Sequence, residues 1–290
     1  MSDFRPRPYL SLLRPPNVVT ALADVLAGYA AAGVPVPVTV HWLLGATACL
    51  YAGGVVLNDY FDRDLDRVER PERPIPSGQI PAGRAAALGG ALLAAGVALA
   101  AAVNAASLAV AAGIAALVLL YDTWGKHHLV IAPVNMGLCR ALNLLLGVSA
   151  APAALAASLP LACIPLAYIA GVTAVSRGEV HGGDRRIAAG ALVFLGLALT
   201  GLALLVVGSP HAILAGIVLA VLVWRIVPPF VQVLRTVRPM DIRHAVVRGV
   251  LSLALVNTVI GTALAGPAYG GAILATALAA GWLARRLAVT

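Results

Sequence analysis

The sequence predicts an all-α protein, a polytopic bundle of transmembrane helices around a central chamber that opens to the cytoplasmic side. Hydrophobic residues make up 61% of its 290 residues and charged residues only 11%, against roughly a quarter in soluble domains. Apolar runs of about 18 to 22 residues recur along the chain, and each can cross about 30 Å of hydrocarbon. These runs have almost no polar face, so the lipid bilayer is their predicted solvent.

The apolar runs divide into nine or ten spans, and ten fit the charges better. No linker rich in Ser, Gly or charge separates them, so residues 1–290 are predicted to form a single membrane domain. We place the spans, to within a few residues, at 17–33, 40–57, 82–103, 105–122, 130–150, 158–175, 187–207, 211–227, 246–265 and 269–287.

The positions of Lys and Arg predict the orientation of these spans. Nearly all of them flank alternate ends of the spans: Arg5, Arg7, Arg14, Arg63, Arg67, Arg70, Arg73, Arg84, Lys126, Arg177, Arg185, Arg186, Arg225, Arg235, Arg238, Arg243, Arg248, Arg285 and Arg286. The opposite connections, at 34–39, 104, 151–157, 208–210 and 266–268, contain none. The positive-inside rule therefore places both termini and the long loops on the cytoplasmic side of the inner membrane. Nine spans would leave Arg285 and Arg286 on the wrong side.

The net charge of +8 follows from the same asymmetry. Its expected partners are anionic lipid headgroups at the cytoplasmic face, and it is no sign of nucleic-acid binding.

An acidic stripe follows the second span, where residues 58–66 read NDYFDRDLD. On a helix with Asn58 at zero, Asp62 falls at about 40°, Asp66 at about 80° and Asp59 at about 100°. Asp64 falls at about 240°, beside arginines that neutralise it. Three carboxylates on one arc at a membrane surface repel one another, and a bound cation removes that repulsion. Hard oxygen ligands favour Mg²⁺, so the stripe predicts a magnesium site.

The alternative for this stripe is a solvated acidic cap paired with Arg63, Arg67 and Arg70. The segment that follows favours the metal site, because Arg70 and Arg73 lie on a proline-stiffened turn within reach of the same face. Carboxylate-bound metal together with arginine is how proteins hold a diphosphate.

At this point the sequence resembles the UbiA superfamily of intramembrane prenyltransferases. The family signature Asn-Asp-x-x-Asp-x-x-x-Asp matches Asn58, Asp59, Asp62 and Asp66, and RPIPSG at residues 73–78 matches the family's next stretch. The family's Tyr-x-x-x-x-Lys element resembles Tyr121 to Lys126, where the Lys contacts the diphosphate and the Tyr lines the chamber. The resemblance implies catalytic roles for Asp62, Asp66, Lys126 and Tyr121, and substrate binding by Arg70, Arg73 and Ser77.

The fifth span carries Asn135, Arg140 and Asn143, which we add to the predicted substrate-binding residues. A charge in the middle of a membrane is costly and usually faces a polar cavity, which makes Arg140 a candidate by itself. The alternative is that Arg140 forms a buried pair with Asp24 or with a helix carbonyl.

The loop after the sixth span departs from the resemblance. Superfamily members carry a second acidic motif here for a second metal, whereas this chain reads SRGEVHGGDRR at residues 176–186. The remaining acids, Glu179 and Asp184, lie about 140° apart on a helix, so they chelate one metal only if Gly178, Gly182 and Gly183 unwind the backbone. Otherwise Arg177, His181 or Arg185 takes the place of the metal electrostatically, and we predict that Arg177 and Arg185 bind substrate. The loop resembles the EboC-type branch of the superfamily.

These features predict Mg²⁺-dependent transfer of an isoprenoid chain from a polyprenyl diphosphate to a lipophilic or small-molecule acceptor at the membrane. The ring of Tyr121 or Tyr168 is expected to stabilise the allylic carbocation. One alternative is sugar or cyclitol transfer onto a polyprenyl phosphate. The other is a component that binds or exports prenyl lipids without turnover.

Overall fold

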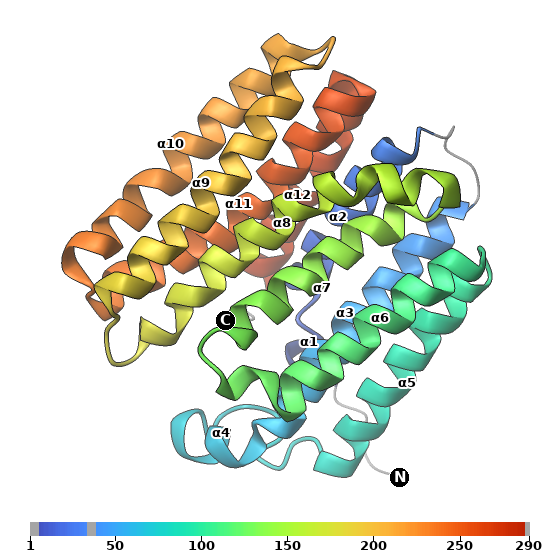
Figure 1. The fold of residues 1–290 in the computed structure, drawn as a ribbon. Helices are drawn as coiled ribbons and strands as arrows, with labels where there is room; N and C mark the ends of the chain where they lie inside the picture. The colour runs from blue at the N-terminus through green and yellow to red at the C-terminus, as the bar shows by residue number, and fades with distance from the viewer. Residues whose placement is uncertain (1–5, 34–38, 288–290) are drawn as a thin grey trace.

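A computed structural model describes residues 6–33 and 39–287, which fold into a bundle of helices with no β-strand in these two ranges (Figure 1). The α-helices are α1 (Pro6–Leu13), α2 (Pro15–Ala32), α3 (Thr39–Phe61), α4 (Arg63–Glu69), α5 (Ala82–Ala101), α6 (Ala105–Thr123), α7 (Ile131–Val148), α8 (Leu155–Ser176), α9 (Arg185–Val207), α10 (Ala212–Thr236), α11 (Pro239–Ala265) and α12 (Pro267–Leu287). Short 3₁₀ turns join some of them: η1 (Gly125–His127), η2 (Pro152–Ala154) and η3 (Arg177–Glu179). The prediction of an all-α fold is confirmed.

Each predicted span coincides with one long helix. These helices are α2, α3 and α5 through α12. The largest differences concern α10 and α11, which meet between residues 236 and 239 rather than leaving a loop at 228–245. The helix α10 continues through Pro228 and Pro229, because neighbouring groups can satisfy the backbone that proline frees in a membrane helix. Arg5 and the connection at 34–38 lie outside the described residues.

Eight helical segments of the described chain are long and apolar enough to cross a membrane: α3, α5, α6, α7, α8 with its flanking η2 and η3 turns, α9, α10 and α11. The chain is therefore a multi-pass membrane protein. The helices α2 and α12 are not in this group, and α2 carries the polar residues Asn17 and Asp24 within its 18 residues. The count of ten spans and the cytoplasmic placement of both termini stay predictions.

The helices form two groups with α2 and α7 between them (Figure 1). One group contains α3, α5 and α6, which contact one another. The other contains α8 to α12, in which α10 packs on both α9 and α11. Since α2 contacts α3, α7, α11 and α12, it is the element around which the two groups meet.

The contact between α2 and α7 is unusually close. A Cβ atom on Gly28 would lie 1.8 Å from the carbonyl oxygen of Leu144, and one on Gly147 would lie 2.0 Å from that of Val25. Only glycine permits this approach of two helix backbones, a device common in membrane bundles. It brings the polar residues of α2 and α7 within hydrogen-bonding distance.

The short helix α1 packs over the end of α3. Its Leu12 is buried in a small cluster with Val56, Ile75, Ile80 and Ala85. This cluster holds both α1 and the turn at residues 70–81 against α3, so it fixes the two segments that surround the acidic stripe.

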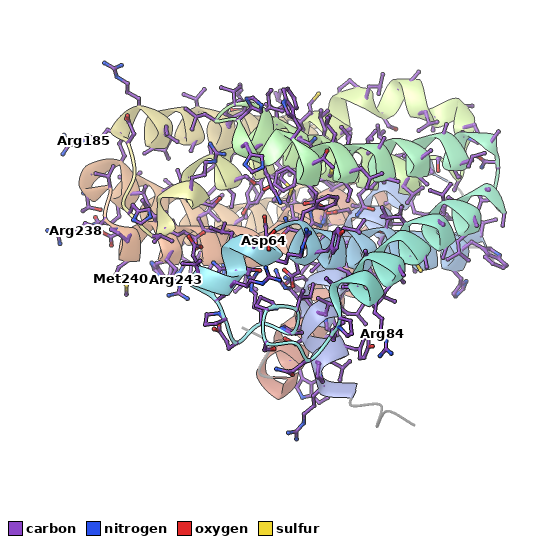
Figure 2. The ribbon with its side chains drawn as sticks, turned by 90° about the horizontal axis from the view of Figure 1, so that it is seen from below. Asp64, Arg84, Arg185, Arg238, Met240 and Arg243 are labelled. Atoms are coloured by element: carbon purple, nitrogen blue, oxygen red, sulfur yellow. The ribbon has the colours of Figure 1, made fainter. Side chains whose placement is uncertain are left out.

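The outer surface is apolar, as expected for a protein solvated by lipid. Val207 and Ile213 are more than four-fifths exposed, and Leu204 and Trp224 nearly three-quarters. Charged side chains collect at the helix ends instead, and Figure 2 shows Arg185, Arg238 and Arg243 grouped at one margin of the molecule.

Candidate functional site

The acidic stripe lies where α3 passes into α4. The helix α3 ends at Phe61 and α4 begins at Arg63, with Asp62 at the joint. Backbone hydrogen bonds from Asp62 N–H to the Asn58 carbonyl (2.9 Å) and from Asp66 N–H to the Asp62 carbonyl (2.8 Å) keep a helical path across this joint. Asp64 is two-thirds exposed and pairs with Arg67 at 2.7 Å, on the side that the helical angle predicts.

Two arginines neutralise one part of the stripe. Arg73 Nη1 lies 2.7 Å from Asp66 Oδ2 and 3.2 Å from Asp59 Oδ1, and both carboxylates are buried. Arg14 Nη2 lies 2.6 Å from the same Asp59 oxygen. Asp59 is thus paired with two guanidiniums, and its role as a metal ligand stays a prediction.

Arg14 reaches Asp59 because the chain reverses sharply between α1 and α2. Its backbone has φ of 46°, in the left-handed region that side chains other than Gly rarely adopt. In the sequence Arg14 is only a marker of orientation, because no local pattern distinguishes it from the other N-terminal arginines.

The other part of the stripe faces the end of α6. Lys126 Nζ lies 2.5 Å from Asp62 Oδ1, and Asn58 Nδ2 donates a hydrogen bond to Asp122 Oδ1 at 2.9 Å. Asp122 is buried, and the sequence analysis missed it as a site residue. Its signal was a carboxylate in the last turn of an otherwise apolar helix, next to Tyr121.

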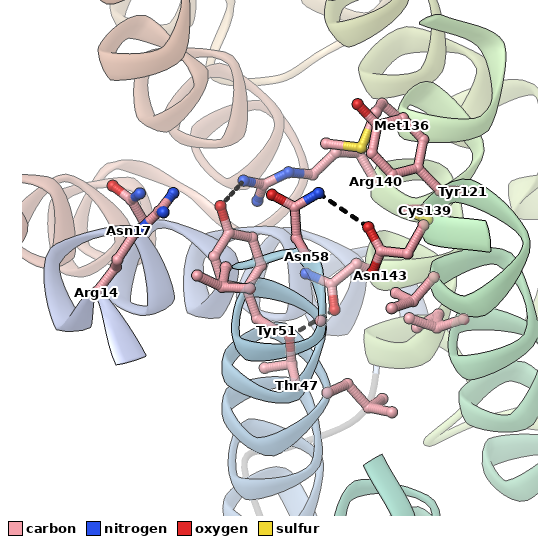
Figure 3. A pocket seen from close by; sticks show the side chains of 16 residues that line it. Arg14, Asn17, Thr47, Tyr51, Asn58, Tyr121, Met136, Cys139, Arg140 and Asn143 are labelled. Atoms are coloured by element: carbon pink, nitrogen blue, oxygen red, sulfur yellow. Dashed lines mark hydrogen bonds between the residues drawn. The ribbon is translucent and has the colours of Figure 1, made fainter. Parts of the chain in front are cut away.

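A cavity of about 250 Å³ lies beside these side chains, between α2, α3, α6 and α7 (Figure 3), and Asp62 and Lys126 are not among its lining residues. Asn58, Tyr121, Asp122 and Arg14 line one end of it. The lining also includes apolar side chains from α3 and α6, among them Leu50, Val55, Ile114 and Val118. Toward the inner end the lining is mixed: Thr47, Tyr51, Arg140 and Asn143 are polar, and the apolar Leu50 and Ile114 lie at a similar depth.

Arg140 belongs to a buried network centred on Asp24. Asp24 is completely buried, and its carboxylate accepts hydrogen bonds from Arg140 Nη1 (2.8 Å), Asn143 Nδ2 (2.9 Å) and Asn257 Nδ2 (2.6 Å). The pairing of Arg140 with Asp24, one of the two readings left open by the sequence, is therefore present. Arg140 also lines the cavity, so the two readings are not exclusive.

The loop between α8 and α9 is not a continuous helix. The helix α8 ends at Ser176, η3 follows, and Gly182 has φ of 89° before α9 begins at Arg185. Unwinding at the glycines is therefore confirmed, but the two carboxylates have different neighbours. Asp184 caps α9 by accepting from the Arg186 backbone N–H at 2.6 Å, while Glu179 faces the charges of Arg243 and Arg70.

Of the two arginines predicted in the second loop, one contacts the site and the other does not. Arg177 donates a hydrogen bond to the Lys126 carbonyl, which ties the second loop to the first site. Arg185 instead donates to the Arg235 carbonyl at 3.3 Å and lies far from Asp64 in Figure 2. The structure therefore does not bring Arg185 to the acidic stripe, and its predicted role in substrate binding stays a prediction.

Three further residues were predicted to contact substrate or intermediate. The Ser77 hydroxyl donates to the Arg73 carbonyl at 2.7 Å, which stabilises the turn that presents Arg73. Asn135 is buried, and its amide nitrogen has no hydrogen-bond partner among the described residues. Tyr168 is buried in the larger core and donates to the Gly249 carbonyl, so its ring does not line the cavity. Of the two rings expected near the carbocation, only Tyr121 lines the cavity.

Comparison with known proteins gives a family match and several relatives. Residues 18–232, more than half of the chain, match the model of the UbiA prenyltransferase family. Digeranylgeranylglyceryl phosphate synthase of Methanospirillum hungatei is 44% identical over 78 residues, which are 27% of this chain and 28% of that protein. The synthase of the same name from Ignicoccus hospitalis is 44% identical over 90 residues, 31% of this chain and 29% of that protein. The aligned segments thus span less than a third of these relatives.

Solved structures share the fold over nearly the whole chain. A UbiA homolog from Aeropyrum pernix K1 superposes with a TM-score of 0.69 at 16% identity, covering 90% of this chain and 98% of that one. A UbiA homolog from Archaeoglobus fulgidus bound to DMAPP and Mg²⁺ gives a TM-score of 0.55 at 19% identity, covering 92% and 99%.

Proposed function

The chain belongs to the UbiA prenyltransferase family, and we propose that it transfers an isoprenoid chain from a polyprenyl diphosphate to an acceptor that reaches the site from the membrane. The observation that carries the proposal is the layer of paired charges next to Asn58 and Asp122, which line one end of the cavity. Asp62 with Lys126, and Asp66 with Arg73, set carboxylates and cations side by side there. A metal–diphosphate group needs both kinds of partner.

Mg²⁺ fits the donor set of this layer. No three His, Cys, Asp or Glu side chains in the described ranges converge as a metal cluster. Mg²⁺ usually takes one or two protein carboxylates and completes its shell with phosphate oxygens and water, so such a cluster is not required. Asn58, Asp62 and Asp66 would hold the ion, which neutralises the charge that develops on the departing diphosphate.

Lys126 and Arg73 would hold the diphosphate directly. Each now neutralises a carboxylate of the stripe, and each can turn its remaining N–H donors toward phosphate oxygens when the substrate enters. Donors aimed at the leaving group stabilise its charge in the transition state. Arg177, bonded to the Lys126 carbonyl, adds a further positive charge at this end.

The cavity would protect the reacting carbon. When the bond between C1 and the diphosphate oxygen breaks, the bonding electrons leave with the diphosphate. The allylic cation would then lie among apolar side chains such as Val55 and Val118, with the ring of Tyr121 beside it. The acceptor bonds to C1 and gives its proton to the diphosphate.

Incubation of purified protein with Mg²⁺ and radiolabelled geranylgeranyl diphosphate tests this proposal, with and without a membrane extract. Diphosphate release accompanied by a new labelled lipid is the expected result. Binding without release would instead indicate a protein that binds or exports prenyl lipids. Labelling of a polyprenyl phosphate only from a sugar or cyclitol diphosphate would indicate the other transferase reaction.

A further inference from the structure

We infer that the polar part of the cavity's inner end, lined by Thr47, Tyr51, Arg140 and Asn143, binds the acceptor through a neutral hydroxyl or carbonyl group. This inference rests on the proposed prenyl transfer and names the class of acceptor for the same cavity. The acceptor class follows from the hydrogen bonds and the net charge of this end.

The inner end lies below the charged layer on the same face of α3. Asn58 and Tyr51 are two helical turns apart, which places them roughly 10 Å apart along the helix axis. Thr47 lies one further turn inward, and all three line the cavity. A molecule that contacts Tyr51 or Arg140 would therefore extend toward the carbon attached to a diphosphate held at Asn58.

Arg140 is held in place by its neighbours, and several of its N–H donors have no hydrogen-bond partner among the described residues. Asp24 fixes one edge of its guanidinium, and the ring of Tyr51 lies 5.0 Å from its central carbon. Among the described residues, its only other hydrogen bond is a long one of 3.4 Å to the Tyr51 hydroxyl (Figure 3). Because a guanidinium carries five N–H donors, several stay available to a ligand.

These donors disfavour an isoprenoid tail at the inner end. Hydrocarbon packed against Arg140 and Tyr51 would exclude water from donors that it cannot bond, and buried unpaired donors are destabilising. A hydroxyl or carbonyl oxygen would instead accept a hydrogen bond from them. The inner end therefore suits the polar head of the acceptor.

The charge of the network selects a neutral head. Asp24 and Arg140 cancel each other, and the amides of Asn143 and Asn257 complete the carboxylate's hydrogen bonds without adding charge. An anionic head would lose its hydration and meet no net positive charge in return. This contrasts with the charged layer near Asn58, where cations are present for a diphosphate.

Equilibrium binding of two matched probes to the full-length protein in lipid nanodiscs tests the inference. The probes are radiolabelled 1-O-octylglycerol and its 3-phosphate, which differ in charge, with protein-free nanodiscs as the blank. We expect the neutral probe to bind at least about tenfold more tightly. Asp24→Asn leaves the charge of Arg140 uncompensated and should reverse this preference.

Tyr51→Phe provides a milder test that does not disturb the ion pair. Loss of its hydroxyl should weaken the neutral probe several-fold, about the effect of one hydrogen bond. Tyr168→Phe is the matched control, because its buried hydroxyl bonds the Gly249 carbonyl away from the cavity. It should leave both probes unchanged.

The inference would be overturned if the unaltered protein bound the phosphate probe more tightly than the neutral one. It would also be overturned if Tyr51→Phe and Tyr168→Phe lost the same affinity for the neutral probe. Binding of geranylgeranyl diphosphate with Mg²⁺ is measured in parallel. If the unaltered protein does not bind geranylgeranyl diphosphate, the proposed function is contradicted. If it binds the diphosphate but the octylglycerol probes do not behave as expected, only the acceptor site is contradicted. If the Asp24→Asn protein does not fold, the inference is still tested by the two tyrosine variants and by the probe preference of the unaltered protein.

Discussion

Lys126 and Asp62 form an ion pair of 2.5 Å that joins the end of α6 to the joint between α3 and α4. The two residues are 64 positions apart in the chain, and both are largely buried. This pair brings the acidic stripe and the Tyr–Lys element into one layer, on which the proposed diphosphate site depends.

Asp62→Asn should remove most of the transferase activity. The amide cannot neutralise Lys126 or hold a cation with the same strength, so kcat should fall by about a hundredfold or more. The measurement is diphosphate release from geranylgeranyl diphosphate at saturating Mg²⁺. Asp64→Asn is the control, since Asp64 is exposed and pairs with Arg67, and it should stay within about twofold of the unaltered protein. Equal damage by both changes would show that Asp62 has no special role.

The sequence predicted the helices and the membrane setting well, because long apolar runs leave few other solutions. It also predicted which face of residues 58–66 carries the stripe, since the helical angle depends only on local spacing. Asp64 points away with Arg67, as that angle requires.

Other features depend on tertiary contacts that local spacing does not contain. Asp122 bonds Asn58 across two helices, and Arg14 meets Asp59 only because of its left-handed backbone. The network around Asp24 joins α2, α7 and α11. The contact of Arg185 with the Arg235 carbonyl likewise joins two helices that are distant in the sequence.

Arg177 should contribute to diphosphate binding more than the carboxylates of the second loop. Asp184 is engaged as a helix cap, whereas Arg177 bonds the Lys126 carbonyl. Arg177→Ala should therefore weaken geranylgeranyl diphosphate binding by about tenfold at saturating Mg²⁺, the loss of one charge-assisted hydrogen bond. Glu179→Gln should leave the Mg²⁺ concentration for half-maximal activity unchanged. A higher Mg²⁺ requirement in Glu179→Gln, with Arg177→Ala unaffected, would favour a second metal instead.

Gly28→Ala should destabilise the bundle. The added methyl group would lie 1.8 Å from the Leu144 carbonyl oxygen, so α2 and α7 must separate, at a cost of about 1–3 kcal/mol or more. Gly90→Ala is the matched change on α5, where nothing lies within 4 Å. It should be neutral or stabilising by up to about 1 kcal/mol. Thermal unfolding in detergent measures both, and equal unfolding temperatures would argue against the close α2–α7 contact.

Both termini should lie in the cytoplasm, because alternate connections lack Lys and Arg. A C-terminal green fluorescent protein should fluoresce in a bacterial host, while alkaline phosphatase at the same position should be inactive. The same pair of reporters placed in the connection at residues 151–157 should give the opposite pattern. Active phosphatase at the C-terminus would place that terminus outside the cytoplasm. With the N-terminus in the cytoplasm, the number of spans would then be odd.

The Mg²⁺ dependence of geranylgeranyl diphosphate binding tests the central claim most directly. The unaltered protein should bind the radiolabelled diphosphate with Mg²⁺ and lose at least about tenfold in affinity when EDTA removes the ion. Asp62→Asn should bind weakly under both conditions, since it lacks the carboxylate that the metal requires. Tight binding that neither EDTA nor Asp62→Asn reduces would contradict the account, because the charged layer at Asp62 and Lys126 would then not hold a metal–diphosphate group.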